Sequence, residues 1–490
     1  MHTSPLRTNP TDLPWVVQKY GGTSVGKFLD VIASRIVPSY LEKNRVVVVC
    51  SARSGETKSK GTTNRLLKAA EEALNNGSQE YLNIVQDIKD DHIAAARSAI
   101  KDQQILEQLE KEIDRQCLRL RSFLQAAEII DEISPRSRDI IVGMGELLSC
   151  NITAALLKDR GIDSQLVVLN NIIDQEFTVL DQTFYDYLSQ RLAEAVQACG
   201  NKVPVLTGFF GNVPGSLLAT IGRGYTDLCA ALVAVGLKAQ ELQIWKEVDG
   251  VFTADPRKVD GARLLSKITP EEAAELTYYG SEVIHPFTME QVIKAAIPIR
   301  IKNVENPAGS GTIIYPETAI LEKKKAEVVH KHPTAVTIKD NICVLNVHSN
   351  RKSVSHGFLA KIFTTLDEHN IVVDLISTSE VHVSMALSTD VVRTSLEKAV
   401  GSLKALGTVD VIENMAILSL VGKDMRNTVG TAGKMFTALA GAGVSIEIIS
   451  QGASEINISC VIAEEKALSA MRAIHERLLT LESIQQAADL

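Results

Sequence analysis

The stretch at residues 15–27 (WVVQKYGGTSVGK) constrains the fold more than any other part of the chain. A short β-prone run ends in a lysine and two glycines, and two hydroxyl residues and an amphipathic helix follow. Gly21 and Gly22 allow backbone N–H groups to approach an anion closely, the helix N-terminus adds partial positive charge, and Lys19 supplies a full charge. Ordinary strand–helix turns have a similar composition, so on spacing alone a phosphate cradle and a plain turn both remain open.

The same stretch nearly forms a Walker A loop, because residues 21–27 fit the pattern G-x-x-x-x-G-K. The next residue is Phe28, where a P-loop needs Ser or Thr to hold Mg²⁺. We therefore reject a P-loop enzyme, and we expect Lys19 at the strand end to be a better phosphate ligand than Lys27 inside the helix. No G-x-G-x-x-G pattern occurs, so a dinucleotide-binding fold is not supported either.

Composition limits the class of protein. A chain of 490 residues is too long for one core, so two or three domains are expected. The net charge of −8 argues against nucleic acid or an anionic membrane as a partner. The seven cysteines are scattered and form no C-x-x-C pair, which predicts free thiols in a reducing compartment. The N-terminus has no signal-peptide core and no run approaches ~18 apolar residues, so we expect a cytoplasmic protein.

Strand and helix patterns alternate through about residue 315. Strands are predicted at 46–50, 165–169, 203–211 and 217–221, and one more strand followed by a turn-rich loop that holds Lys246 is predicted within 241–259. Helices are predicted at 27–42, from Thr62 or Thr63 onward, at 78–133 (a helical hairpin), at 138–160 and at 181–199. Pro38 is expected to kink or shorten the first of these helices. The alternation predicts a mostly parallel sheet with helices on both faces.

Four polar residues, Lys19, Ser51, Arg223 and Lys246, each follow the end of a predicted strand. Ligands bind to such sheets beyond the carboxyl ends of the strands, so the agreement of four loops predicts a site there. Arg223 can bind a carboxylate bidentately, and Asp227 can orient a lysine or a metal. Glu146 lies between apolar neighbours on a predicted helix, and by itself it indicates either a site residue or a side chain that keeps its charge in solvent.

The C-terminal part contains an internal repeat. Residues 358–377 match residues 431–450 at an offset of 73, and in each copy a strand precedes a helix and two strands follow it. Such a short period predicts two small α/β modules packed together. Few catalytic residue types occur in them, so they are interpreted as a binding or assembly unit, and a dimerisation platform without a ligand remains the alternative.

Four motifs, KYGGTSVG, GRGYTD, KEVDGVFTADPR and YGSEVIHPFTMEQ, occur in the order typical of the amino acid kinase family. Together with the repeat, they make the chain resemble aspartate kinases with tandem ACT domains, most closely the fungal monofunctional enzymes. The resemblance implies an α/β, three-layer fold with a mostly parallel sheet, followed by two βαββαβ-type ACT modules. The implied boundaries are a tail at 1–14, a kinase domain at 15–320 with an insertion at about 78–133, a linker at 321–335, and modules at 336–412 and 413–490.

The resemblance also implies a reaction, the transfer of a phosphoryl group from MgATP to the β-carboxylate of L-aspartate, at the entry to threonine, methionine and isoleucine synthesis. In-line transfer between anions requires positioning and charge neutralisation, for which Lys19 and Asp227 would be catalytic. The implied substrate ligands are Ser51, Thr63, Glu146, Arg223 and Thr226. The implied ATP ligands are Lys19, Gly21, Gly22, Thr23, Ser24, Lys246, Glu247, Phe252 and Arg257, with Mg²⁺ held through ATP and no metal ligands from the protein.

Two departures from the family pattern bear on this site. Glu282 stands where many bacterial members have a lysine that reaches the nucleotide, which puts one ATP contact in doubt. Tyr225 and Thr226 replace a common Gly-Ser pair, and the threonine preserves the hydroxyl.

Family effector sites form where paired ACT modules meet, which implies an amino-acid effector and a homo-oligomer, with threonine favoured over lysine. The implied effector ligands are Ser355, Gly357, Phe358, Leu359, Val373, Asp374 and Ser379. Asp374 would hold the effector ammonium, unless its carboxylate merely caps a strand end. Two alternatives to an aspartate kinase stay open, namely a kinase of glutamate or N-acetylglutamate and a non-catalytic amino-acid sensor.

Overall fold

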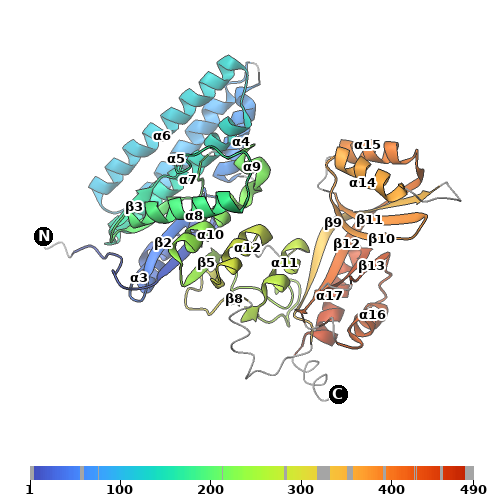
Figure 1. Ribbon diagram of the computed structural model, residues 1–490. Coiled ribbons are helices and arrows are strands. Elements are labelled where there is room, and N and C mark those ends of the chain that lie inside the picture. Colours follow the sequence, from blue (N-terminus) through green and yellow to red (C-terminus); the bar gives the residue numbers. More distant parts are fainter. Residues whose placement is uncertain are drawn as a thin grey trace. The chain divides into compact units, whose positions relative to one another are not determined.

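The computed structural model (Figure 1) describes residues 5–55, 60–75, 77–211, 213–280, 284–316, 332–349, 357–389, 393–423, 425, 428–452 and 456–480. At Ala219, Arg223, Pro286 and Arg393 it describes the backbone alone. The chain forms two compact units. The first comprises Met1–Val251, Ser266–Ile268 and Ile284–Glu322, and the second comprises Phe252–Leu265, Thr269–Val283 and Lys323–Leu490.

The first unit is built on an eight-stranded sheet with the order β3-β4-β2-β1-β5-β7-β8-β6. Its strands are β1 (Trp15–Tyr20), β2 (Arg45–Cys50), β3 (Ser164–Val167), β4 (Val203–Thr207), β5 (Glu241–Lys246), β6 (Lys267–Ile268), β7 (Ile299–Asn303) and β8 (Thr312–Ile314). Neighbouring strands pair in parallel except β7 and β8, which pair antiparallel. The prediction of a mostly parallel sheet is confirmed.

Helices cover this sheet on both faces, which explains why its central strands are buried, including the polar residues Gln18 and Lys19 of β1. Every residue of β1 and β4 is buried, as are all residues of β2 except Arg45. The helices of this unit are α1 (Gly22–Lys27), α2 (Leu29–Val31), α3 (Val37–Leu41), α4 (Thr62–Ala73), α5 (Glu80–Ala99), α6 (Gln103–Ile130), α7 (Pro135–Asp159), α8 (Gln182–Gln197), α9 (Leu217–Thr220), α10 (Tyr225–Leu237) and α12 (Pro286–Lys294). In Figure 1, α5 and α6 form the predicted helical hairpin.

The helix expected at 27–42 is a helical run divided into α2, a π-helical turn (Ile32–Ile36) and α3, with Pro38 in the first turn of α3. Two other local predictions were wrong. Helix α4 has Gly61 as its N-cap and no side-chain capping bond, so Thr62 and Thr63 lie in its first turn. The strand expected at 217–221 is helix α9, followed by a 3₁₀ turn (Gly222–Gly224).

Helix α7 runs through the core of the first unit. Among the described helices it has the length and apolar composition of a membrane span, but 83% of that window is buried inside the fold. Its N-cap is Ser134, whose hydroxyl accepts a hydrogen bond from the Ser137 N–H, and it therefore begins three residues before the predicted start. A central position in the core accounts for the apolar composition of this helix.

The second unit is built on a six-stranded antiparallel sheet with the order β10-β11-β9-β12-β14-β13. The strands are β9 (Ala335–Ser349), β10 (Val373–Thr378), β11 (His382–Ser388), β12 (Gly407–Val421), β13 (Ile448–Ser450) and β14 (Asn457–Ala463). The helices are α11 (Pro270–Tyr278), α14 (Phe358–Glu368), α15 (Arg393–Leu403), α16 (Thr431–Gly441) and α17 (Glu464–Leu478). The predicted order of one strand, one helix and two strands in each copy of the repeat is confirmed.

Strands β9 and β12 each span 15 residues and contribute to two hydrophobic cores. The predicted boundary at 412/413 falls within β12, where the register with β9 shifts between Ile412 and Met415. The first part of β9, residues 335–339, was expected to lie in the linker and the first module. Instead it pairs with the end of β12, and Val336 and Ile338 pack into the core of the second module.

Two segments that lie within the predicted kinase domain, Phe252–Leu265 and Thr269–Val283, are part of the second compact unit. Thr253 ties the first of them to the C-terminal modules. Its carbonyl accepts from the Val336 N–H at 2.8 Å, and its hydroxyl lies 2.9 Å from Nε2 of the buried His475. Residues 317–331, which include most of the predicted linker, lie outside the described part of the chain.

Candidate active site

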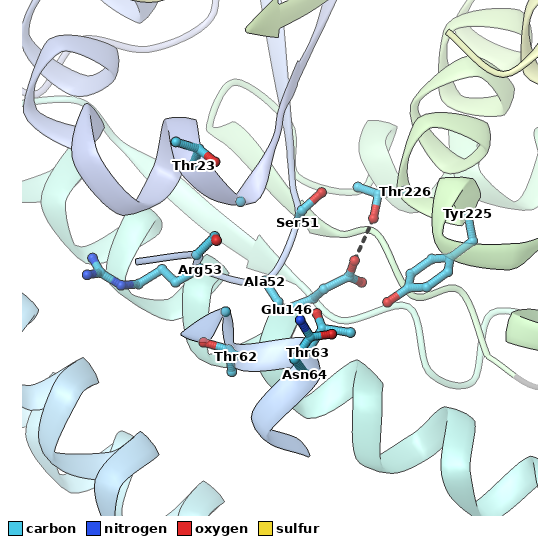
Figure 2. A pocket seen from close by; sticks show the side chains of 13 residues that line it. Thr23, Ser51, Ala52, Arg53, Thr62, Thr63, Asn64, Glu146, Tyr225 and Thr226 are labelled. Atoms are coloured by element: carbon cyan, nitrogen blue, oxygen red, sulfur yellow. Dashed lines mark hydrogen bonds between the residues drawn. The ribbon is translucent and has the colours of Figure 1, made fainter. Parts of the chain in front are cut away.

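A cavity of about 230 Å³ lies beyond the carboxyl ends of β1 and β2 in the first unit (Figure 2). It is lined by Gly22, Thr23, Ser51, Ala52, Arg53, Ser54, Gly61, Thr62, Thr63, Asn64, Glu146, Tyr225 and Thr226. The structure therefore brings together six residues that were assigned to substrate or ATP, namely Gly22, Thr23, Ser51, Thr63, Glu146 and Thr226. The position agrees with the rule that ligands bind at this end of a parallel sheet.

Glu146 is the acidic group of the cavity and extends into it from α7. Its side chain is buried, and Oε1 accepts a hydrogen bond of 2.6 Å from the Thr226 hydroxyl, drawn as a dashed line in Figure 2. Oε2 is buried and makes no hydrogen bond of standard geometry among the described residues, although the Tyr225 side chain and the Phe209 backbone also act on this carboxylate. Burial raises the pKa of Glu146 to about 7, although hydrogen bonding to Thr226, the Phe209 backbone and Tyr225 opposes the rise. A buried carboxylate that lines a cavity is suited to a ligand that brings a positive charge.

Lys19 and Asp227 form an ion pair near the carboxyl end of β1. Lys19 Nζ lies 2.8 Å from Asp227 Oδ1, and the Lys19 residue is 9% exposed. A Cβ placed on Gly21 would lie 3.9 Å from the same Nζ, so the ammonium lies beside the turn into α1. Lys27, by contrast, is exposed in the last turn of α1. This arrangement places a lysine, an orienting carboxylate and glycine backbone together, as phosphoryl transfer requires.

Close backbone approaches explain why glycines surround the cavity. A Cβ on Gly22 would lie 2.5 Å from the Ala52 carbonyl oxygen, and a Cβ on Gly26 would lie 2.0 Å from that of Ser54. The Ser54 N–H also donates to the Gly22 carbonyl at 2.9 Å. The turn into α1 and the loop after β2 therefore pack backbone against backbone and form one wall of the cavity.

The residues assigned to ATP are divided between the two units. In the first unit, the hydroxyl of the buried Ser24 donates to Glu247 Oε1 at 2.7 Å, and Lys246 ends β5. Phe252 and Arg257 belong to the second unit, where the Arg257 side chain is 87% exposed and pairs with Asp255 at 2.8 Å. Glu282 lies outside the described residues.

The described backbone places Arg223 in the 3₁₀ turn between α9 and α10, not after a strand as predicted. Its side chain lies outside the described part of the structure. The site analysis from the sequence missed Arg53, Thr62, Asn64 and Tyr225, which line the cavity. Their position close to Ser51, Thr63 and Thr226 in the sequence could have identified them. Figure 2 shows the Arg53 side chain running away from Glu146.

The predicted effector residues lie at the start of α14 and along β10 in the second unit. Gly357 is the N-cap of α14 with φ +76°, Phe358 is buried and Leu359 is exposed. Asp374 Oδ1 lies 2.6 Å from Lys339 Nζ, so its carboxylate already has a cationic partner on β9.

The remaining predicted effector residues are Val373, Ser379 and Ser355. Val373 begins β10 and is half-buried, and Ser379 is exposed, with its N–H donating to the His382 carbonyl in a turn. Ser355 lies outside the described residues. The effector assignment therefore stays a prediction.

Comparison with known proteins agrees with this architecture. Residues 14–303 match the amino acid kinase family, and residues 418–478 match an ACT domain. The aspartokinase of Schizosaccharomyces pombe is 56% identical over 95% of this chain and 93% of its own length. The aspartokinase of Saccharomyces cerevisiae is 51% identical over 95% of this chain and 93% of its own length.

Solved structures of an aspartokinase are also similar to this chain. Escherichia coli aspartokinase III in complex with aspartate and ADP (R-state) is similar with a TM-score of 0.74 at 28% identity, covering 94% of this chain and 99% of that one. The same enzyme in complex with lysine and aspartate (T-state) gives a TM-score of 0.76 at 28% identity, covering 95% and 99%. The chain therefore belongs to the amino acid kinase family. Within that family it is an aspartate kinase with an ACT regulatory domain, and hence a phosphotransferase.

Proposed function

We propose that the chain transfers the γ-phosphoryl group of ATP to the β-carboxylate of L-aspartate and so forms 4-phospho-L-aspartate. The observation that carries this proposal is the buried carboxylate of Glu146 inside a cavity lined with hydroxyl groups. A free amino acid brings an ammonium group for that carboxylate and carboxylate oxygens for the hydroxyls of Ser51 and Thr63. The E. coli relative has been solved with aspartate and ADP bound, which supports the same pair of ligands here.

The residues of the chain supply positioning and charge in this reaction. Lys19 neutralises charge on the phosphoryl group as it moves between two anionic oxygens, and Asp227 holds the Lys19 ammonium in place. Thr226 orients Glu146 through their hydrogen bond, and Glu146 fixes the amino end of the substrate. With the substrate held at both ends, its β-carboxylate is presented to the nucleotide in a single orientation.

Mg²⁺ is the expected metal, because ATP-dependent transfer requires a cation that screens the phosphates. In the described part of the chain, no group of three or more His, Cys, Asp or Glu residues could hold a metal ion by itself. We therefore propose that Mg²⁺ arrives with the nucleotide phosphates. The residues assigned to that nucleotide are Lys19, Gly21, Gly22, Thr23, Ser24, Lys246, Glu247, Phe252 and Arg257.

We further propose feedback control through the ACT modules, with threonine as the effector, in a cytoplasmic homo-oligomer that serves threonine, methionine and isoleucine synthesis. The ACT domain match supports an amino-acid effector, and similarity to fungal aspartokinases favours threonine. Lysine, which was bound in one structure of the E. coli relative, is the comparison effector. Inhibition by each amino acid, mass in solution and cell fractionation test these proposals separately.

The decisive experiment traps the acyl phosphate with hydroxylamine in the presence of ATP and Mg²⁺. L-Aspartate, L-glutamate and N-acetyl-L-glutamate are compared as acceptors. We expect hydroxamate from aspartate alone, because N-acetylation removes the ammonium that Glu146 binds and glutamate is one methylene longer. Product from glutamate or N-acetylglutamate would instead identify that acid as the substrate.

A Lys19→Ala variant separates an enzyme from an amino-acid sensor. It should lose turnover while retaining effector binding, because the effector residues belong to the second unit. Folded wild-type protein that yields no product with any acceptor would leave the sensor as the better interpretation.

A further inference from the structure

Asp139 is a buried carboxylate that the reaction chemistry leaves without a role. It lies on α7 and is 2% exposed. Its oxygens accept three hydrogen bonds, from the Ser216 hydroxyl at 2.8 Å, the Leu217 N–H at 2.6 Å and the Leu218 N–H at 3.2 Å. All three donors belong to one short segment at the start of α9. A buried carboxylate with three such donors forms a strong and geometrically fixed attachment.

Glu146 follows Asp139 by seven residues on the same helix. Residues seven apart return to the same face of an α-helix, about 10.5 Å along its axis. While Asp139 holds residues 216–218, Glu146 accepts from Thr226. Helix α7 therefore holds the segment 216–226 at two points, and the turn Gly222–Gly224, which contains Arg223, lies between them.

Little other regular structure fixes the segment between the attachments to Asp139 and Glu146. Helix α9 is four residues long, and Gly215 and Gly222 have φ of +83° and +78°. A chain with left-handed glycines on both sides of one helical turn can pivot if its attachment is lost. The Asp139 hydrogen bonds thus fix the start of this segment relative to Glu146.

We propose that Asp139 is a positioning residue that fixes the segment 216–226, whose Tyr225 and Thr226 line the cavity, relative to Glu146, and thereby sets the length of amino acid that the cavity accepts. The proposal rests on the proposed function, because it treats the cavity as the binding site for an amino-acid substrate. Asp139 itself does not line the cavity. It acts by holding the backbone that leads into Tyr225 and Thr226.

Asp139→Asn and Ser216→Ala test the proposal in the full-length protein. Asparagine has one acceptor oxygen, and its NH₂ group faces the N–H donors, so we expect KM for aspartate to rise by about tenfold or more with KM for ATP nearly unchanged. Ser216→Ala removes one of the three bonds and should raise KM for aspartate by about threefold. The ratio of kcat/KM for aspartate over glutamate should fall in both variants, because a looser segment admits a longer acid.

Asp102→Ala is the stability control. Asp102 caps α6 by accepting from the Gln104 and Ile105 N–H groups through one oxygen, in the helical hairpin. Alanine removes this cap, whereas asparagine would preserve it, so Asp102→Ala should lower stability without changing KM for aspartate or the aspartate-to-glutamate ratio. A change in KM and in that ratio that appears in Asp139→Asn but not in Asp102→Ala would therefore report loss of positioning.

Hydrogen exchange of the peptide containing residues 216–226 gives a readout that does not depend on turnover. Asp139→Asn should speed exchange at Leu217 and Leu218 by about tenfold or more, because their N–H groups lose the carboxylate. If Asp139→Asn fails to fold, Ser216→Ala is still expected to show a smaller increase in both exchange and KM.

Two results would overturn the role proposed for Asp139, and they can be told apart. Wild-type protein that phosphorylates no amino acid would overturn the proposed function and, with it, this inference. Wild-type protein active on aspartate, with both variants folded and unchanged in KM and in the aspartate-to-glutamate ratio, would overturn the role of Asp139 alone.

Discussion

Glu146 carries the charge that the substrate ammonium is proposed to bind, and burial raises its pKa to about 7. The side chain is therefore only partly ionised at neutral pH in the ligand-free protein. Binding of an ammonium group requires the ionised form, so kcat/KM for aspartate should rise between about pH 6 and pH 8. Glu146→Gln should lower kcat/KM at pH 8 by about a hundredfold, since a charge-assisted hydrogen bond is lost.

The pH profile separates this role from a structural one. A glutamine at this position cannot ionise, so the rise near pH 7 should disappear in the variant. KM for ATP in the same assays is the internal control, because the nucleotide makes no use of the ammonium site. A Glu146→Gln enzyme that keeps the wild-type rise would assign the pH dependence to another group.

At the scale of the element, the helical hairpin carries a buried histidine, His92, on α5. Burial lowers the pKa of His92 to about 4, and the ring is inaccessible to solvent. The unfolded chain takes up a proton at this residue near pH 6.5 while the folded chain does not, so the free energy of unfolding falls as the pH drops below that value. The loss from His92 should be about 2 kcal/mol between pH 7 and pH 5.

Urea unfolding at pH 7 and pH 5 measures that loss. His92→Gln should be less stable than wild type at pH 7 but should lose less stability on acidification, because its side chain does not titrate. His369→Gln, at the end of α14 and outside any hydrophobic core, is the control and should keep the wild-type difference. Equal differences in wild type and His92→Gln would refute the assignment to His92.

Periodicity and strand-end polar residues were sufficient to predict most elements of this fold. The apolar run at 46–50 and the amphipathic hairpin encode their structure locally, and Lys19 and Ser51 were identified from the loops that contain them. Glu146 and Thr226 were assigned through the family resemblance. The features that escaped prediction depend on residues far apart in the chain. Helix α9 forms where Asp139 caps residues 77 to 79 positions away, and residues 335–339 pair with the end of β12.

In the whole molecule, the reactivity of the cysteine thiols measures how tightly the two units are packed. All seven are free and buried, and they are distributed over both units. Burial raises the pKa of Cys117 to about 11 and of Cys460 to about 12, and it raises the pKa of Cys150 and Cys229 well above the usual value. Because the thiolate is the reactive form, these four thiols should be both shielded and protonated in the native protein, and burial should shield the other three as well.

Titration with Ellman's reagent tests this expectation. Fewer than about one thiol per chain should react within minutes in the native protein, since reaction must await local or global opening. Seven should react in denaturant, and the native rate should rise with urea as openings become frequent. Cys50 directly precedes Ser51 of the cavity, and Cys150 lies one helical turn beyond Glu146, so aspartate should slow the labelling of these two thiols further. Rapid reaction of any thiol in the native protein, identified by mass spectrometry, would show that the unit containing it opens more readily than its packing implies.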